Sequence, residues 1–163
     1  MNTNYTNYYR RPYEPKKAVK SFQDLEIYQK ALESSVAISN TLSKNSGKKI
    51  KNSGASKEIK TKIINEAIDC ANQIPHLMAA AHSCRFGSET QCLRLLDEVM
   101  MKCNRIVVYL EQVRDICQIG AEWEWFNERV KTYFYIRRKT LNLQRVWRKY
   151  IQINKQETLN GKN

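Results

Sequence analysis

Residues 59–117 decide the fold of this chain, and they read IKTKIINEAIDCANQIPHLMAAAHSCRFGSETQCLRLLDEVMMKCNRIVVYLEQVRDIC. Apolar side chains recur in steps of three or four along both halves of this stretch. They are Ile59, Ile63, Ala67, Cys70, Ile74, Leu77 and Ala81, then Cys92, Leu96, Val99, Cys103, Ile106, Leu110, Val113 and Cys117. This spacing is typical of helices that pack one face against a neighbour. The segment SCRFGS at residues 83–88 separates the halves, so the stretch predicts a helical hairpin.

Pro75 lies inside the first half of this hairpin, where a proline is unfavourable. Proline has no backbone N–H, so the carbonyl of Ala71 loses its helical hydrogen bond, and the ring clashes with the preceding turn. We therefore expect a kinked second helix.

Two further helices are predicted on either side of the hairpin. Ser21 and Asp24 are spaced as in a capping box that opens the first of them. Its apolar row consists of Phe22, Leu25, Tyr28, Leu32, Val36 and Leu42. The last helix begins with one apolar row, made of Trp123, Phe126, Val130, Tyr133, Phe134 and Leu141. A second row, made of Ile136, Leu143, Trp147 and Tyr150, is rotated by about a third of a turn, as expected for a helix that bends or meets another subunit.

Glycines separate these helices, because Gly47, Gly54, Gly87 and Gly120 all fall between apolar rows. No segment requires a strand. The sequence therefore predicts an all-α, antiparallel up-down four-helix bundle in a single domain. The bundle is expected at residues 21–153, with helices at about 21–43, 57–83, 88–117 and 122–153. A disordered basic and aromatic arm at 1–20 and a disordered tail at 154–163 are expected to flank it.

The chain carries 28 Lys and Arg against 16 Asp and Glu, which gives a net charge of +12. Such an excess usually has an anionic partner, with nucleic acid as the first candidate and a membrane surface as the second. A soluble basic protein without a specific partner is the alternative. The cations gather in three segments, at residues 1–20, 44–62 and 129–149, and this separation favours RNA or DNA.

The last of these segments supplies the main candidate RNA-binding residues. They are Arg137, Arg138, Arg145, Arg148 and Lys149, with Lys48, Lys49, Lys51, Arg10 and Arg11 as mobile helpers. Tyrosines lie among the cations of the arm and of the last helix, and this mixture suits unpaired bases. Phosphate contacts of this kind give affinity without base specificity.

Catalytic and metal-binding patterns are not found in the sequence. There is no phosphate-binding loop and no HExxH motif, and His76 and His82 are spaced to lie on different sides of a helix. Four of the five cysteines fall on the apolar rows of the hairpin, where they are interpreted as small buried hydrophobes. We expect a protein that is not an enzyme and binds no cofactor or metal. With no signal-peptide pattern and no apolar run of membrane length, we also expect a cytoplasmic location and no membrane partner.

Several segments resemble a known family. Residues 22–31, FQDLEIYQKA, resemble the opening of the small four-helix-bundle proteins encoded within 23S rRNA intervening sequences. Ile74 and Pro75 are similar to that family's Ser-Ile-Pro segment, and GSE at 87–89 followed by LRLL at 93–96 resembles the start of its third helix. The basic fourth helix and the lysine-rich first loop look more like a second branch of the same fold. That branch is the accessory variability determinant of diversity-generating retroelements.

The resemblance implies a pentameric barrel that associates with a reverse transcriptase and its template RNA. On this basis we expect a non-catalytic RNA-binding accessory subunit needed for mutagenic cDNA synthesis. The alternative is a structural homo-oligomer of the intervening-sequence type whose partner is a protein.

Overall fold

The computed structural model describes residues 19–46 and 56–160. It contains four long helices, α1 (Glu26–Ser46), α2 (Lys57–Cys84), α3 (Glu89–Gln112) and α4 (Trp123–Asn160). The described residues include no strand. The predicted all-helical fold with four helices is therefore confirmed.

The N-terminal boundary of the bundle follows the predicted capping box. The Ser21 hydroxyl accepts a hydrogen bond from the Gln23 amide at 3.2 Å, and the Asp24 carboxylate accepts one from the Ser21 amide at 2.9 Å. This cap opens a single 3-10 turn, Phe22–Asp24, rather than the long helix itself. Leu25 is extended, and α1 begins only at Glu26.

The ends of α3 and α4 differ from those expected. The last five residues of the predicted third helix, Val113–Cys117, form a π-helical turn, and Gln118 follows it in the left-handed conformation with φ 48°. The fourth helix continues to Asn160, which corrects the expected end at residue 153 and the tail predicted from 154. Residues 154–160, NKQETLN, contain no glycine or proline, so no stop signal occurs before Gly161.

The hairpin forms most of the core. All eight apolar residues predicted for its second half are buried, including three cysteines. In the first half, Ala67, Cys70, Ile74 and Ala81 are buried, whereas Ile59 is exposed in the first turn of α2. Full burial of an Ile or Leu side chain contributes about 1.5–3 kcal/mol. The predicted hairpin is therefore the main source of packing energy.

The outer helices present different faces to the core from those predicted. In α1, Leu32 and Val36 are 43% and 51% exposed, while the buried face carries Ala31, Ser34, Ser35, Ile38 and Leu42. In α4, one face is buried between Phe126 and Gln144, and it consists of Phe126, Tyr133, Ile136, Thr140 and Gln144. The core face of this part of α4 includes members of both predicted rows, and polar residues continue it beyond Ile136. The bend or subunit contact expected from the two rows stays a prediction.

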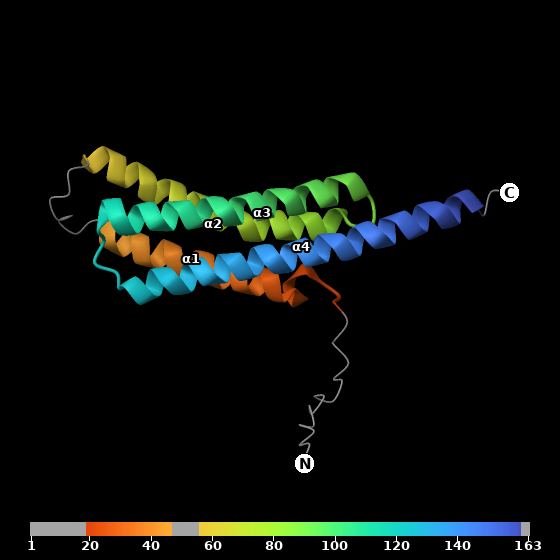
Figure 1. The fold of residues 1–163 in the computed structure, drawn as a ribbon, viewed down its shortest axis with the longest axis horizontal. Coiled ribbons are helices and arrows are strands. Elements are labelled where there is room, and N and C mark those ends of the chain that lie inside the picture. Colours follow the sequence, from red (N-terminus) through yellow and green to blue (C-terminus); the bar gives the residue numbers. More distant parts are fainter. Residues whose placement is uncertain (1–18, 47–55, 161–163) are drawn as a thin grey trace, which may run out of the picture.

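Contacts between neighbouring helices define the arrangement seen in Figure 1. The α2 helix packs against α1 and α3, and α4 packs against α3 and α1. Hydrogen bonds join Lys60 to Cys117, Glu66 to Tyr109, and Cys70 to Lys102, and so link α2 to α3 and to the π-helical turn that follows it. The C-terminal end of α4 extends past the other three helices.

The α2 helix is continuous through Pro75, and this proline is buried. Its missing N–H leaves the carbonyl of Ala71 without its usual helical donor. The kink expected there stays a prediction. None of the described helices is long and apolar enough to span a membrane.

Candidate nucleic-acid interface

The predicted RNA-binding residues of the last helix all lie on α4, but not on one face. Arg138, Arg145, Arg148 and Lys149 are exposed, whereas Arg137 is half-buried. The other five candidates, Arg10, Arg11, Lys48, Lys49 and Lys51, lie outside the described residues. The structure therefore places four of the ten candidates at exposed positions.

The charged residues of α4 are all positive over most of the length of the helix. Residues 131–153 contain seven Lys and Arg and no Asp or Glu. The segment itself therefore carries only positive side-chain charge, which favours anions along its exposed side.

Four exposed cations form a line along α4, which we call the cationic row: Lys131, Arg138, Arg145 and Lys149. Their separations of seven, seven and four residues keep them within about 40° of one another around the helix. At 1.5 Å per residue the row is about 27 Å long. No carboxylate of the described residues forms an ion pair with any member. Lys131 was missed, although its heptad spacing to Arg138 and Arg145 was a usable signal.

Arg137 lies at the inner edge of α4 rather than on the row. Its Nε atom is buried without a hydrogen-bond partner in the described residues, as is that of Arg129. These two arginines flank Tyr133, which is fully buried and whose pKa is raised by that burial. The Ser34 hydroxyl opposes this rise in the pKa of Tyr133. The hydroxyl oxygens of Ser34 and Tyr133 are both buried without a hydrogen-bond partner among the described residues.

A second group of cations surrounds Tyr135, where α4 meets α1. The charged groups of Lys30, Arg138 and Lys139 lie 5.5, 5.9 and 5.3 Å from the centre of its ring. The Tyr135 hydroxyl donates a 2.7 Å hydrogen bond to Glu26, and this bond raises the pKa of Tyr135. We call these five residues the Tyr135 cluster. Lys30 and Lys139 were not predicted, because nothing in the sequence showed that α1 and α4 meet here.

Aromatic side chains cluster where the C-terminal end of α2 meets α4. The His82 ring lies 6.4 Å from both the Phe22 ring and the Trp147 ring. Burial, and then the Arg85 charge, lower the pKa of His82, while Asp24 opposes this shift. Arg85 Nη1 contacts the His82 ring nitrogens and donates to the His82 carbonyl at 2.9 Å. His82 thus packs between the Phe22–Asp24 turn and α4, and connects both of them to α2.

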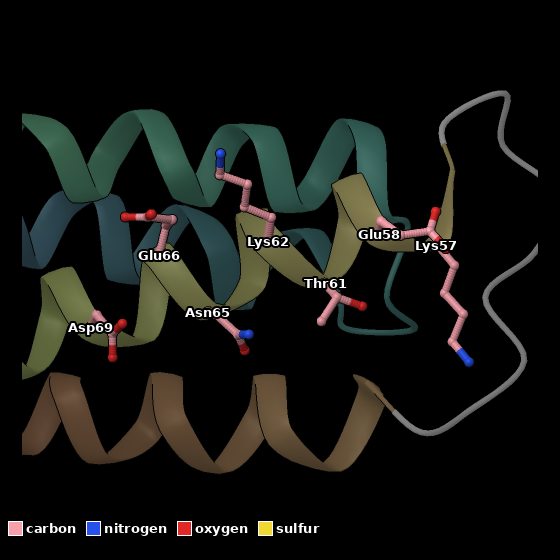
Figure 2. Close-up of a pocket in the computed structure, with 7 residues that line it drawn as sticks. All are labelled: Lys57, Glu58, Thr61, Lys62, Asn65, Glu66 and Asp69. Atoms are coloured by element: carbon pink, nitrogen blue, oxygen red, sulfur yellow. The ribbon is translucent and has the colours of Figure 1, made fainter.

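An open depression on α2 is the other notable surface feature, and Figure 2 shows its seven lining residues. Lys62 and Glu66 lie on the side of α2 next to α3, while Asn65 and Asp69 lie on the side next to α1. The lining contains two lysines and three carboxylates, so it does not favour a polyanion. No group of His, Cys, Asp and Glu in the described part of the chain is placed to hold a metal ion.

Comparison with known proteins gives no relative: no family model, no curated protein and no solved structure matches the chain. The resemblance described from the sequence therefore rests on the quoted residues alone.

Proposed function

We propose that this protein is a non-catalytic RNA-binding subunit that holds an RNA strand along α4. The observation that carries the proposal is the cationic row, whose four members are exposed, aligned and without an ion pair among the described residues. An RNA strand supplies phosphates that take the place of the missing carboxylates. Release of condensed counterions then drives the association.

The row holds the RNA backbone without reading its sequence. Lys and Arg contacts to phosphate fix the position of a strand but carry no base information. The Tyr135 cluster lies beside the row, since Arg138 belongs to both. It adds Lys30 and Lys139, and so extends the positive surface from α4 onto α1.

The biological role that we propose is that of an accessory subunit in a diversity-generating retroelement. In this role the protein holds template RNA for a reverse transcriptase during mutagenic cDNA synthesis in the cytoplasm. The family resemblance and the basic α4 support the proposal. The proposed assembly is an antiparallel up-down bundle that forms a pentameric barrel. Support for the antiparallel order comes from three hydrogen-bonded pairs, in which residue numbers rise along α2 as they fall along α3 and the turn that follows it.

Charge reversal of the row tests RNA binding. The variant carries Lys131→Glu, Arg138→Glu, Arg145→Glu and Lys149→Glu. The matched control carries Lys44→Glu, Lys57→Glu, Lys62→Glu and Arg105→Glu, at exposed cations of the other helices. Both variants change the net charge equally. Binding of a single-stranded RNA is measured against salt concentration.

If each row member contacts one phosphate, the log–log salt slope of the row variant is less steep by about 2.8 than that of the wild-type protein. The control variant is expected to keep most of the wild-type slope. Equal losses in the two variants would show that only net charge matters, and a flat wild-type response would exclude RNA binding through phosphates.

A second candidate function is a structural homo-oligomer with a protein partner. It is favoured by the exposed apolar residues Val146, Tyr150 and Ile153, which follow one another on one side of α4. Light scattering measures the oligomer directly. Capture of a reverse transcriptase that survives nuclease treatment would support this candidate over RNA binding.

A further inference from the structure

Phe86, in the α2–α3 connection, is the most exposed large apolar side chain among the described residues. Its relative exposure is 86%, compared with 63% for the next, Met101 and Tyr150. A phenyl ring left in water forgoes the stabilisation that burial gives. Phe86 does not contribute to the core, so the folded bundle gives no reason for a large apolar residue at this position.

Arg85 holds the Phe86 ring in a defined environment. The guanidinium carbon of Arg85 lies 4.3 Å from the ring centre, which places the charged group on the ring as in a cation–π contact. Arg85 is itself tied to the end of α2 through the His82 carbonyl, at 2.9 Å. Because one guanidinium covers only one face of a phenyl ring, the opposite face is open to a planar group.

The helix ends on either side of Phe86 pack against the positive part of α4. Trp147 packs beside His82, at a ring separation of 6.4 Å, and Gln144 hydrogen-bonds the Leu93 carbonyl in the first turns of α3. The end of α2 and the start of α3, which flank the connection, therefore pack against α4 at Trp147 and Gln144. Arg145 and Arg148 are exposed at this level, and Lys149 follows.

We propose that Phe86 is a stacking site for one unpaired nucleobase of an RNA strand held on α4. This inference rests on the proposed function, since α4 supplies the phosphate contacts. The aromatic face binds the base without regard to its identity, and the flanking arginines neutralise the adjoining phosphates. Phe86 thereby distinguishes single-stranded RNA, whose bases are free to stack, from a duplex, whose bases are not.

The test compares Phe86→Ala, Phe86→Leu and Phe86→Trp for binding to a single-stranded RNA and to a duplex of the same length. Loss of one stacked base is expected to weaken single-strand binding by about 5- to 140-fold in the Ala variant. The Leu variant retains apolar area but has no aromatic face, and so is expected to lose nearly as much. The Trp variant retains the affinity, and duplex binding does not change.

Salt dependence separates this inference from the proposed function. Removing Phe86 removes no charge, so the salt slope of the Ala variant stays that of the wild-type protein. Wild-type affinity of the Ala variant for the single strand would overturn the stacking site alone. A wild-type protein that binds no RNA would overturn both proposals. Weaker capture of a protein partner by the Ala variant, with RNA binding intact, would assign Phe86 to a protein contact instead.

Quenching of a 2-aminopurine placed along the single strand gives a second measurement. A fluorescent base stacked on an aromatic ring is quenched, so at least one position in the strand loses fluorescence on binding the wild-type protein. That quenching is expected to disappear in Phe86→Leu and persist in Phe86→Trp. Equal quenching by all variants would contradict the assignment.

Discussion

The side chain of Gln144 on α4 joins Asp97 on α3: its Nε2 donates to Asp97 Oδ1 at 2.7 Å and to the Leu93 carbonyl at 3.0 Å. Gln144 is buried, Asp97 is exposed, and both bonds are partly shielded from water. A buried amide is costly unless it is hydrogen-bonded, and here both of its donor hydrogens are used. The pair therefore fixes how α4 sits on α3 at the level where the positive segment begins to leave the bundle.

Replacing Gln144 by Ala is expected to lower the free energy of unfolding by about 2 kcal/mol, because two hydrogen bonds, one of them to a carboxylate, are lost. Gln144→Leu keeps most of the volume and is expected to cost less. Urea denaturation measures both. Asn142→Ala, at an exposed position on the same helix, is the control and is expected to change stability by less than about 0.5 kcal/mol. An equal loss in the control would show that the loss does not come from the buried bonds of Gln144.

Removal of the buried hydroxyl of Tyr133, unlike the loss of Gln144, is expected to stabilise the protein. It has no hydrogen-bond partner of acceptable geometry in the described residues, and an unsatisfied buried polar group costs about 1–3 kcal/mol. Tyr133→Phe is therefore expected to raise the free energy of unfolding by about 1 kcal/mol. Tyr133→Ala, by contrast, is expected to lower it by about 3–5 kcal/mol through the cavity. Thermal and urea unfolding distinguish the two effects, and a destabilised Phe variant would reveal a partner for the hydroxyl.

His82 makes stability depend on pH. Its folded-state pKa is lowered, first by burial and then by Arg85, so the unfolded chain binds the proton more readily than the folded one. Stability is therefore complete above the unfolded pKa of about 6.5 and falls as the pH decreases through that value towards the lower folded pKa. Asp24 acts in the opposite direction and limits the effect.

Urea unfolding between pH 8 and pH 5 measures this dependence. His82→Gln is expected to remove part of the decline below pH 6.5, while His76→Gln, at an exposed position, is expected to retain it. An unchanged decline in His82→Gln would assign the pH dependence to other groups.

The Glu26 carboxylate lowers the net positive charge of the Tyr135 cluster, where it is held by its hydrogen bond from the Tyr135 hydroxyl. Glu26→Gln keeps a hydrogen-bond acceptor and removes the charge. The variant is expected to bind RNA about two- to threefold more tightly at low salt, as one fewer carboxylate repels the phosphates. The gain is expected to shrink as salt rises. RNA titration at two salt concentrations measures it, with Glu98→Gln on the exposed face of α3 as control. An equal gain in the control would mean that the strand does not approach the cluster.

Much of the fold follows from local patterns in the sequence. The heptad-like spacing of the hairpin predicted its buried face, because large apolar residues leave only one helical face that all of them share. In α1 the same reasoning was wrong. There the core face carries Ala31, Ser34 and Ser35, and larger residues, Leu32 and Val36, remain outside. Residue size alone does not show how closely two helices approach, and a close approach selects small residues.

The candidate interface was predictable only in part, for a related reason. The cations of α4 are visible as a composition, and the row can be read from heptad spacing. The Tyr135 cluster depends on the pairing of α1 with α4, which no local pattern encodes. Phe86 gave no periodic signal, since its significance lies in its exposure and in the guanidinium held against its ring.

The absence of Asp and Glu from residues 131–153 also affects the stability of the α4 helix itself. Like charges one turn apart, such as Arg145 and Lys149, destabilise a helix by about 0.2–0.5 kcal/mol per pair. Where α4 extends past the other helices, tertiary packing no longer compensates for this repulsion. In the proposed complex with RNA, bound phosphates would relieve this repulsion. Part of the binding free energy would then stabilise the last turns of α4, so this end of the helix would become more ordered as the strand binds.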